Sequence, residues 1–143
     1  MISVVRFRSL EQPGLAEKAV AIRNEVFVKG QHVDVWIELE YEEESNHYLL
    51  FLDDLPVATA RWRKTDKGIK LERFATLPEY RNRGYGARLL EEIMIDVSGF
   101  GEKIYLHAQL AAVRFYEKHG YVKEGEVFYE ANIGHVGMYY SPR

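Results

Sequence analysis

A short glycine-containing stretch near the middle of the chain has the residue types needed to hold a phosphate group. Its six residues are Arg81, Asn82, Arg83, Gly84, Tyr85 and Gly86. The stretch lies between a predicted strand and a predicted amphipathic helix. The first turn of a helix offers unpaired backbone N–H groups and partial positive charge, and glycine lets a ligand approach closely. We therefore predict a phosphate-binding turn, with a plain turn before a helix as the alternative.

Two better-known phosphate motifs do not fit this stretch. No Gly-Lys-Ser/Thr follows, which excludes a Walker loop, and the third glycine of the dinucleotide-binding fingerprint is missing. The charge around it is uneven, because residues 61–88 contain nine Lys and Arg against three acids in a chain of net charge -3. A locally basic segment on an acidic protein favours a small polyanionic ligand over nucleic acid. A solvated face of mixed charge is the alternative.

The composition is that of an ordinary globular protein. The chain has 143 residues, 47% of them hydrophobic and 29% charged, and no cysteine. This excludes disulfides, a thiol nucleophile and cysteine-ligated zinc, and it suits one domain over residues 1–143. The longest apolar run, residues 48–52, is too short to cross a bilayer, and the N-terminal residues lack a signal sequence. We expect a cytoplasmic protein without a membrane partner.

Alternation and helical spacing predict the elements that must position the turn. Strands are predicted at 3–8, 48–52, 57–63, 69–76, 103–107, 121–129 and 135–140, and helices at 15–28, 86–97 and 111–119. The strands from 48 to 76 form an antiparallel meander, and residues 69–107 form a right-handed parallel crossover. We predict an α/β fold: a mixed, largely antiparallel sheet of six to seven strands with helices on both faces.

Two motifs resemble the GNAT superfamily of N-acetyltransferases. Arg81-x-x-Gly84-x-Gly86, after the strand that ends LERFATLP, is similar to the acyl-CoA signature of that family. Residues 108–121, AQLAAVRFYEKHGY, resemble its second motif at the expected spacing. The stretches 22–28 and 128–135 resemble a subgroup of small bacterial members, although Asn132 and Gly134 stand where glycine and proline are expected. The resemblance covers nearly the whole chain.

The resemblance implies acetyl-CoA as donor, a primary amine of a small molecule or peptide as acceptor, and no metal. Backbone amides of residues 83–86 would hold the pyrophosphate. The strand 69–76 would separate from the strand 103–108 at a bulge, and pantetheine would lie in the gap. Backbone N–H groups near the bulge would polarise the thioester carbonyl. The cofactor-binding residues implied are Phe74, Ala75, Thr76, Arg81, Asn82, Arg83, Gly84, Tyr85, Gly86 and Gln109.

Acetylation of an amine also needs proton transfers. A primary amine has a pKa near 10.4, so its deprotonation at pH 7 costs about 4–5 kcal/mol and needs a base or a site that lowers this pKa. The resemblance implies Glu72 as general base, and an ion pair of Glu72 with Arg61 or Arg73 is the alternative. His107 and His135 are weaker candidates. The likeness implies Tyr116 as proton donor to the leaving thiolate, with core packing as the alternative.

The acceptor is indicated only by an acidic run, residues 38–44, which holds five glutamates. The segment borders the acceptor site in the superfamily, so these glutamates would attract a cationic amine such as a polyamine, an aminoglycoside or a lysine side chain. A solvated loop is the alternative. A non-catalytic acyl-CoA-binding module and an unrelated phosphate-binding domain are the rival functions. Whether the chain forms a homodimer stays open.

Overall fold

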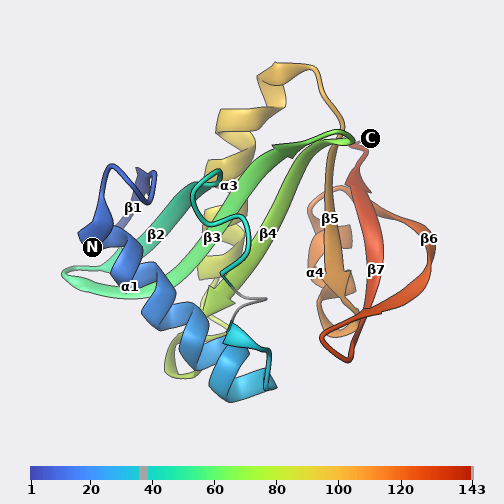
Figure 1. Ribbon diagram of the computed structural model, residues 1–143. Coiled ribbons are helices and arrows are strands. Elements are labelled where there is room, and N and C mark those ends of the chain that lie inside the picture. The colour runs from blue at the N-terminus through green and yellow to red at the C-terminus, as the bar shows by residue number, and fades with distance from the viewer. Residues whose placement is uncertain (36–38, 143) are drawn as a thin grey trace.

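The computed structural model describes residues 1–35 and 39–142, and seven strands form one sheet in the order β1-β2-β3-β4-β5-β7-β6 (Figure 1). The elements are β1 (Ile2–Phe7), α1 (Pro13–Arg23), β2 (Asn46–Leu52), β3 (Leu55–Thr65), β4 (Gly68–Thr76), α3 (Tyr85–Val97), β5 (Ile104–Gln109), α4 (Val113–Lys118), β6 (Tyr121–Glu130) and β7 (Ile133–Tyr140).

Strand pairing is antiparallel everywhere except between β4 and β5. The strands β2, β3 and β4 form the predicted meander, and α3 connects β4 to its parallel neighbour β5. The last two strands form a hairpin in which β7, not β6, lies next to β5. The predicted mixed and largely antiparallel sheet is confirmed.

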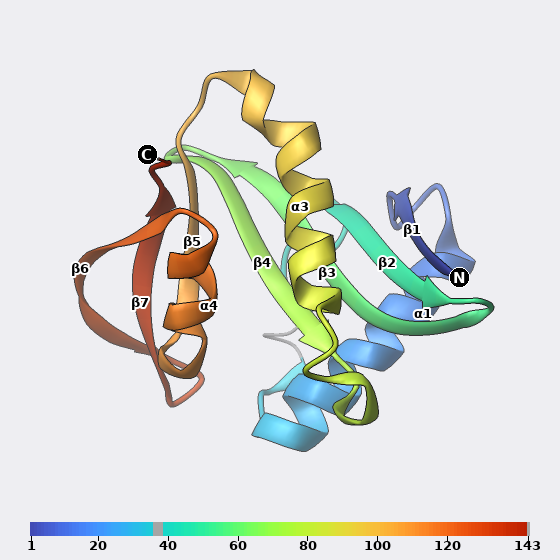
Figure 2. The same cartoon turned by 180° about the vertical axis from the view of Figure 1, so that it is seen from behind.

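Helices cover both faces of this sheet, as expected from the sequence. Figure 2 shows α3 and α4 on one face, and Figure 1 shows α1 on the other. The apolar stripe of α3, which includes Leu89, Leu90 and Ile93, is buried against the sheet in the larger core. Ala19 and Ile22 of α1 pack in a second core on the opposite face.

The first helix differs from the prediction. Instead of one helix over residues 15–28, α1 ends at Arg23 and a π-helical turn, Asn24–Lys29, follows it. The wider turn still buries Val26 in the core beneath α1. The side chain of Arg23, at the junction, is 1% exposed. Apolar spacing alone cannot reveal such a junction, because the same residues remain on the buried face.

A bulge in β4 makes that strand diverge from β5. Thr59 pairs with Ala75 and Arg61 pairs with Glu72, so two residues of β4 lie opposite one residue of β3. The first of the two, Arg73, has φ 59°, in the left-handed region. Pairing between β4 and β5 covers only three residues of each strand and ends at Leu71. The strands then separate, as Figure 1 shows, which agrees with the bulge and gap that the family resemblance implies.

Candidate active site

A cavity of about 800 Å³ occupies the gap between the diverging strands. Its walls are the second half of β4, the end of β5, the turn at residues 80–87, the start of β7 and part of α4. Gln31, Glu40 and Tyr41 line it from the segment that follows α1. The residues that line the cavity therefore come from elements on both faces of the sheet.

Strand register places a set of polar side chains on one of these faces. The parallel β4–β5 pairing aligns Lys70 with the residue two before His107, so Lys70, Glu72 and His107 project from the same face. Gln109 pairs with His135 on β7, which adds both to this set. The face is the one that α1 covers, and all five residues line the cavity.

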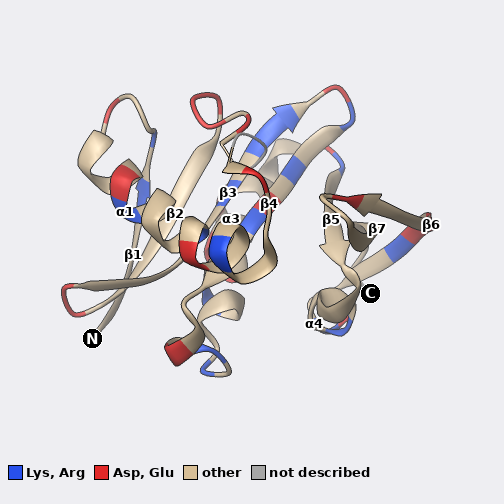
Figure 3. Cartoon of the chain, turned by 60° about the horizontal axis from the view of Figure 1, so that its bottom comes forward, with Lys and Arg blue, Asp and Glu red and all other residues tan. Residues whose placement is uncertain are grey.

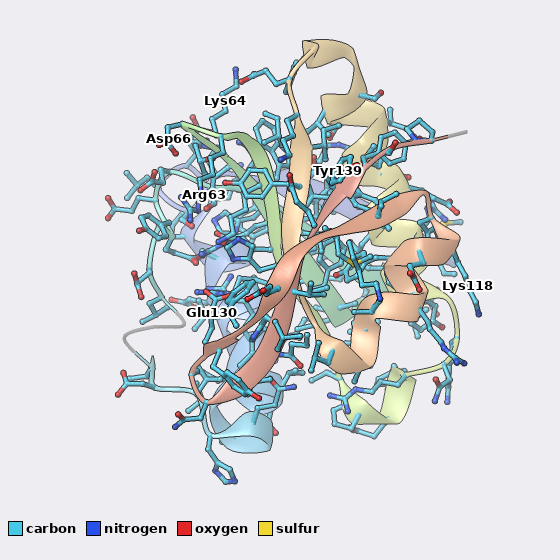
Figure 4. The ribbon with its side chains drawn as sticks, turned by 90° about the vertical axis from the view of Figure 1, so that its right-hand side faces the viewer. Arg63, Lys64, Asp66, Lys118, Glu130 and Tyr139 are labelled. Atoms are coloured by element: carbon cyan, nitrogen blue, oxygen red, sulfur yellow. The ribbon has the colours of Figure 1, made fainter. Side chains whose placement is uncertain are left out.

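The opposite face carries α4 and its aromatic side chains. In Figure 4, Arg63 and Glu130 lie on one side of the sheet and Lys118 of α4 on the other. Tyr116 of α4 lines the cavity from that second side, where its ring meets Phe74 edge-on at 5.9 Å. The cavity thus joins a polar compartment to an aromatic one.

The glycine-containing turn presents backbone donors to the cavity. Gly84 has φ 84°, precedes α3 and is capped by no side chain. The first bond of the helix runs from the backbone N–H of Arg88 to the carbonyl of Gly84, at 3.1 Å. The N–H groups of Tyr85, Gly86 and Ala87 therefore lack intrahelical partners, and all three residues line the cavity. An anion fits such a helix start.

The two arginines of the turn behave differently. Arg81 lines the cavity, and its Nε donates to the carbonyl of Thr76 at 3.1 Å. Arg83 donates to the carbonyl of Glu79 at 3.2 Å and stacks over the ring of Tyr80. The side chain of Arg83 is therefore turned away, and this residue is not among those lining the cavity. As a cofactor-binding residue it retains only its backbone.

The remaining predicted cofactor-binding residues line the cavity. Phe74, Ala75 and Thr76 lie on the part of β4 that has no pairing with β5, so one backbone edge is open there. Asn82 lies in the turn with φ 63°. Gln109 contacts a residue that the sequence did not suggest: Gln109 and Gln31 exchange two amide hydrogen bonds, of 2.9 and 3.1 Å.

Glu72 is enclosed by cationic side chains. Its Oε1 accepts from Nε of Arg61 and from Nε of Arg63, both at 2.9 Å, and Lys70 lies 3.5 Å from Oε2. Figure 3 shows the Lys and Arg residues of β3 and β4 in blue. Burial raises the pKa of Glu72, but Arg61, Lys70, Arg73 and Arg63 outweigh it and lower the pKa to about 2. A carboxylate so held is a weak proton acceptor, which favours the ion-paired alternative over the role of general base.

The acidic run does not line the acceptor side as a unit. Glu42 accepts from Arg23 at 2.6 Å and from Arg61 at 3.2 Å, and both arginines are buried. The carbonyls of Glu43 and Glu44 lie near Arg8, and neither residue lines the cavity. Glu38 lies outside the described residues. The side chains of Glu42, Glu43 and Glu44 therefore do not line the cavity, whereas Glu40 and Tyr41 of the same run do. Attraction of a cationic acceptor by the run 38–44 stays a prediction, in which Glu40 is the described glutamate placed to act.

Tyr116 is buried among aromatic rings at the cavity wall. Its ring packs edge-on against Phe115 and Tyr121. No hydrogen bond joins its hydroxyl to another described residue. Burial raises the pKa of Tyr116 well above its usual value, so the hydroxyl keeps its proton at neutral pH. The geometry fits both aromatic packing and a proton donor that faces the cavity.

Several lining residues were missed by the sequence reasoning. They are Gln31, Tyr41, Arg63, Lys70, Glu130 and Ile133. Glu130 belongs to the stretch that resembles a bacterial subgroup, and this was a usable signal. Lys70 could have been predicted once Glu72 was placed in the site, because residues two apart in a strand project from the same face. Nothing in the sequence marks Gln31 as a cavity residue, because its position depends on where the π-helical turn ends.

The described residues contain neither a membrane-spanning helix nor a metal-binding cluster. No helix in residues 1–35 and 39–142 is long and apolar enough to cross a membrane. No group of three or more His, Asp or Glu side chains in the same part of the chain is arranged to hold a metal ion.

Comparison with known proteins identifies the family. The sequence model of the acetyltransferase (GNAT) domain matches residues 11–142. The uncharacterized N-acetyltransferase YjcF of Bacillus subtilis is 41% identical over 127 residues, which are 84% of this chain and 88% of that protein.

Solved structures have the same fold. An acyl-CoA N-acyltransferase from Pseudomonas aeruginosa superposes with a TM-score of 0.87 over 99% of this chain and 100% of that one, at 21% identity. An aminoglycoside 6'-N-acetyltransferase complexed with coenzyme A gives a TM-score of 0.74 at 17% identity, covering 99% of this chain and 98% of that one. The resemblance seen in the two motifs is confirmed, and the chain belongs to the GNAT family of acetyltransferases.

Proposed function

We propose that the protein transfers an acetyl group from acetyl-CoA to a primary amine of a small molecule or peptide by direct attack. One observation carries the proposal: a cavity runs through the gap between β4 and β5 and joins an anion-binding helix start to a polar compartment on the other face. A donor with a pyrophosphate and an acceptor with an amine can therefore meet between the strands.

The donor side has the chemistry that coenzyme A requires. The open N–H groups of residues 85–87 and the charge of Arg81 suit a pyrophosphate. The unpaired edge of β4 near Phe74 and Ala75 can hydrogen-bond an amide-containing arm and polarise a carbonyl. The coenzyme A bound to the aminoglycoside acetyltransferase of the same fold supports this choice of donor.

The reaction forms a C–N bond and breaks a C–S bond. The amine approaches from the polar face, whereas the sulfur leaves near α4, where Tyr116 lines the cavity. A thiol has a pKa of about 8.5, so a hydrogen bond and proton from a neutral phenol ease the departure of the thiolate. Because burial raises its pKa, Tyr116 keeps its proton and can offer a hydrogen bond to the developing thiolate, although the raised pKa also makes it a weaker acid.

The test is acetyl-CoA turnover measured by release of free thiol. Acceptors would be spermidine, glucosamine, an aminoglycoside and a lysine-containing peptide, and each acetylated product would be identified by mass spectrometry. Amine-dependent thiol release with a matching product supports the proposal. Tight acetyl-CoA binding without turnover of any amine would favour the rival function, a non-catalytic acyl-CoA-binding module.

A further inference from the structure

The polar face of the cavity holds a histidine and a glutamate that the proposed function leaves without a role. His107 is on β5 and Glu130 is the last residue of β6, and both line the cavity. Nδ1 of His107 lies 3.3 Å from Oε1 of Glu130. The ring of Phe128 meets the imidazole edge-on at 5.0 Å and limits its rotation. Two residues far apart in the sequence are thus brought together as an imidazole–carboxylate pair.

The pair leaves one imidazole nitrogen available. Nδ1 is enclosed, and within the described residues it has no aligned hydrogen bond, so the Glu130 carboxylate is the acceptor placed to take its N–H. A contact of 3.3 Å is loose, as such bonds often are before substrate binds. The contact with His107 is the main cause that lowers the pKa of Glu130, so the carboxylate stays ionised. In a neutral ring whose proton is on Nδ1, Nε2 carries the lone pair.

The pair also lies at the right point along the cavity. Pairing of β4 with β5 ends at Leu106, so His107 is the first residue of β5 beyond the split. It shares the polar face with Glu72, whose three cationic neighbours occupy its carboxylate. The opposite face carries Tyr116. A base at His107 and an acid at Tyr116 would therefore act from opposite sides of the gap.

We propose that His107 is the general base of the acetylation and that Glu130 is its positioning residue; the inference rests on the proposed function. Nε2 of His107 takes one proton from the acceptor ammonium. The freed amine attacks the thioester carbonyl, the C–N bond forms, and the C–S bond breaks with its electron pair on sulfur. Tyr116 protonates the thiolate and regains a proton from water. The second proton of the attacking nitrogen passes to water, and His107 also gives its proton to water before the next cycle. One proton is released per turnover.

Other ionisable groups surround the imidazole and set the sign of the expected pH effects. They are Glu130 on β6, Lys70 and Glu72 on β4, His135 on β7, and Tyr105 on β5. The Glu130 carboxylate attracts the positive charge that the imidazole gains when it takes up a proton, whereas the Lys70 ammonium repels it.

The experiment compares pH profiles of kcat/KM for the best amine of the panel. In His107→Gln, we expect a loss of about 10²–10⁴-fold at pH 7 that shrinks as the pH approaches 10, where the amine arrives unprotonated. In Glu130→Gln, we expect a smaller loss that also shrinks as the pH approaches 10, because Glu130 acts only through His107. His119→Gln is the matched control, because the ring of His119 is also held through Nδ1, here by the carbonyl of Phe115 at 2.8 Å, but His119 does not line the cavity. Acetyl-CoA affinity, measured by calorimetry, reports whether each variant is folded.

The outcomes separate the base assignment from the proposed function. Wild-type turnover together with full activity in His107→Gln overturns the assignment alone, as does a loss equal at every pH. If the acidic limb of the kcat/KM profile is lost in His135→Gln but kept in His107→Gln, His135 is the base. This outcome also overturns the assignment of His107. Absence of turnover in the wild type defeats the proposed function and the assignment together. If His107→Gln does not bind acetyl-CoA, the pH profiles of kcat/KM for His107→Asn and Glu130→Gln decide whether His107 is the base.

Discussion

Arg61 and Glu72 are cross-strand partners whose ion pair is almost entirely removed from water. The side chain of Arg61 is 0% exposed and that of Glu72 is 7% exposed, and Nε of Arg61 donates to Oε1 of Glu72 at 2.9 Å. The same guanidinium also donates to Glu42 and to the carbonyl of Glu40. Arg61 of β3 therefore connects Glu72, which lines the cavity, to the segment that contains Glu40 and Glu42.

This relationship predicts a large effect of Glu72→Gln on stability. Breaking a buried ion pair by removing one partner costs about 3–5 kcal/mol. The pKa of Glu72 is lowered from 4.5 to about 2, so its contribution is full above pH 4.5 and is lost as the pH falls toward 2. The free energy of unfolding in urea should therefore be lower for Glu72→Gln than for the wild type at pH 7. This difference should shrink as the pH falls from 4.5 toward 2. The exposed Glu117→Gln is the control and should show little change.

The same variant tests the role of general base. At a temperature where Glu72→Gln stays folded, we expect kcat to change by less than about tenfold, because its carboxylate is occupied by Arg61, Arg63 and Lys70. A loss of 10²-fold or more that recovers at high pH would return the base role to Glu72.

Gly86 tests the phosphate-binding turn. A Cβ at this position would meet the ring of Phe115 at 3.7 Å, an ordinary contact, so Gly86→Ala should fold and bind acetyl-CoA normally. Gly86→Glu adds a carboxylate at the helix start, and we expect acetyl-CoA affinity to fall at least about tenfold through like-charge repulsion. Calorimetry measures both variants. Equal affinities in the two folded variants would exclude this turn as the pyrophosphate site.

Tyr116→Phe tests the proton donor. The change keeps the aromatic packing against Phe74 and removes only the hydroxyl. We expect kcat to fall about 10²–10⁴-fold with little change in acetyl-CoA affinity. Tyr121→Phe is the matched control, because Tyr121 is also buried but its hydroxyl contacts Met94 away from the cavity. If single-turnover rates of Tyr116→Phe match the wild type, the tyrosine serves packing alone.

Most strands and helices could be predicted from the sequence, because their signals are local. Alternation gave the strands, the stripe on α3 gave the crossover helix, and glycine spacing gave the turn. The bulge came only through the family resemblance, because the left-handed conformation of Arg73 depends on pairing with β3. The order β5-β7-β6 was also hidden, since nothing local says which strand of a hairpin joins the sheet.

The candidate site was less accessible to sequence reasoning, because its charges act across strands. Glu72 was found, but its partners on β3 decide its chemistry and are fixed only by register. Glu42 was interpreted as part of an acidic run facing the acceptor, although its carboxylate is only partly exposed and is the counter-ion of the buried Arg23 and Arg61. The contact between His107 of β5 and Glu130 of β6 joins two strands that are not neighbours in the sheet, so the spacing of residues in the sequence could not predict it.

Glu40 offers the remaining test of a cationic acceptor. It is exposed and lines the cavity, whereas Glu43 and Glu44 do not line it. A unit charge near a cation in water contributes about 1 kcal/mol at 4 Å, so Glu40→Gln should raise the KM for spermidine by up to about fivefold. The effect should weaken with salt, because screening acts over about 8 Å at physiological ionic strength. The double variant Glu43→Gln/Glu44→Gln should leave this KM nearly unchanged, and the KM for acetyl-CoA should not move in either variant. If Glu40→Gln changes the KM for spermidine and the KM for an amine with no second charge equally, the protein has no preference for polycations. The acceptor would then be selected by the shape of the polar compartment.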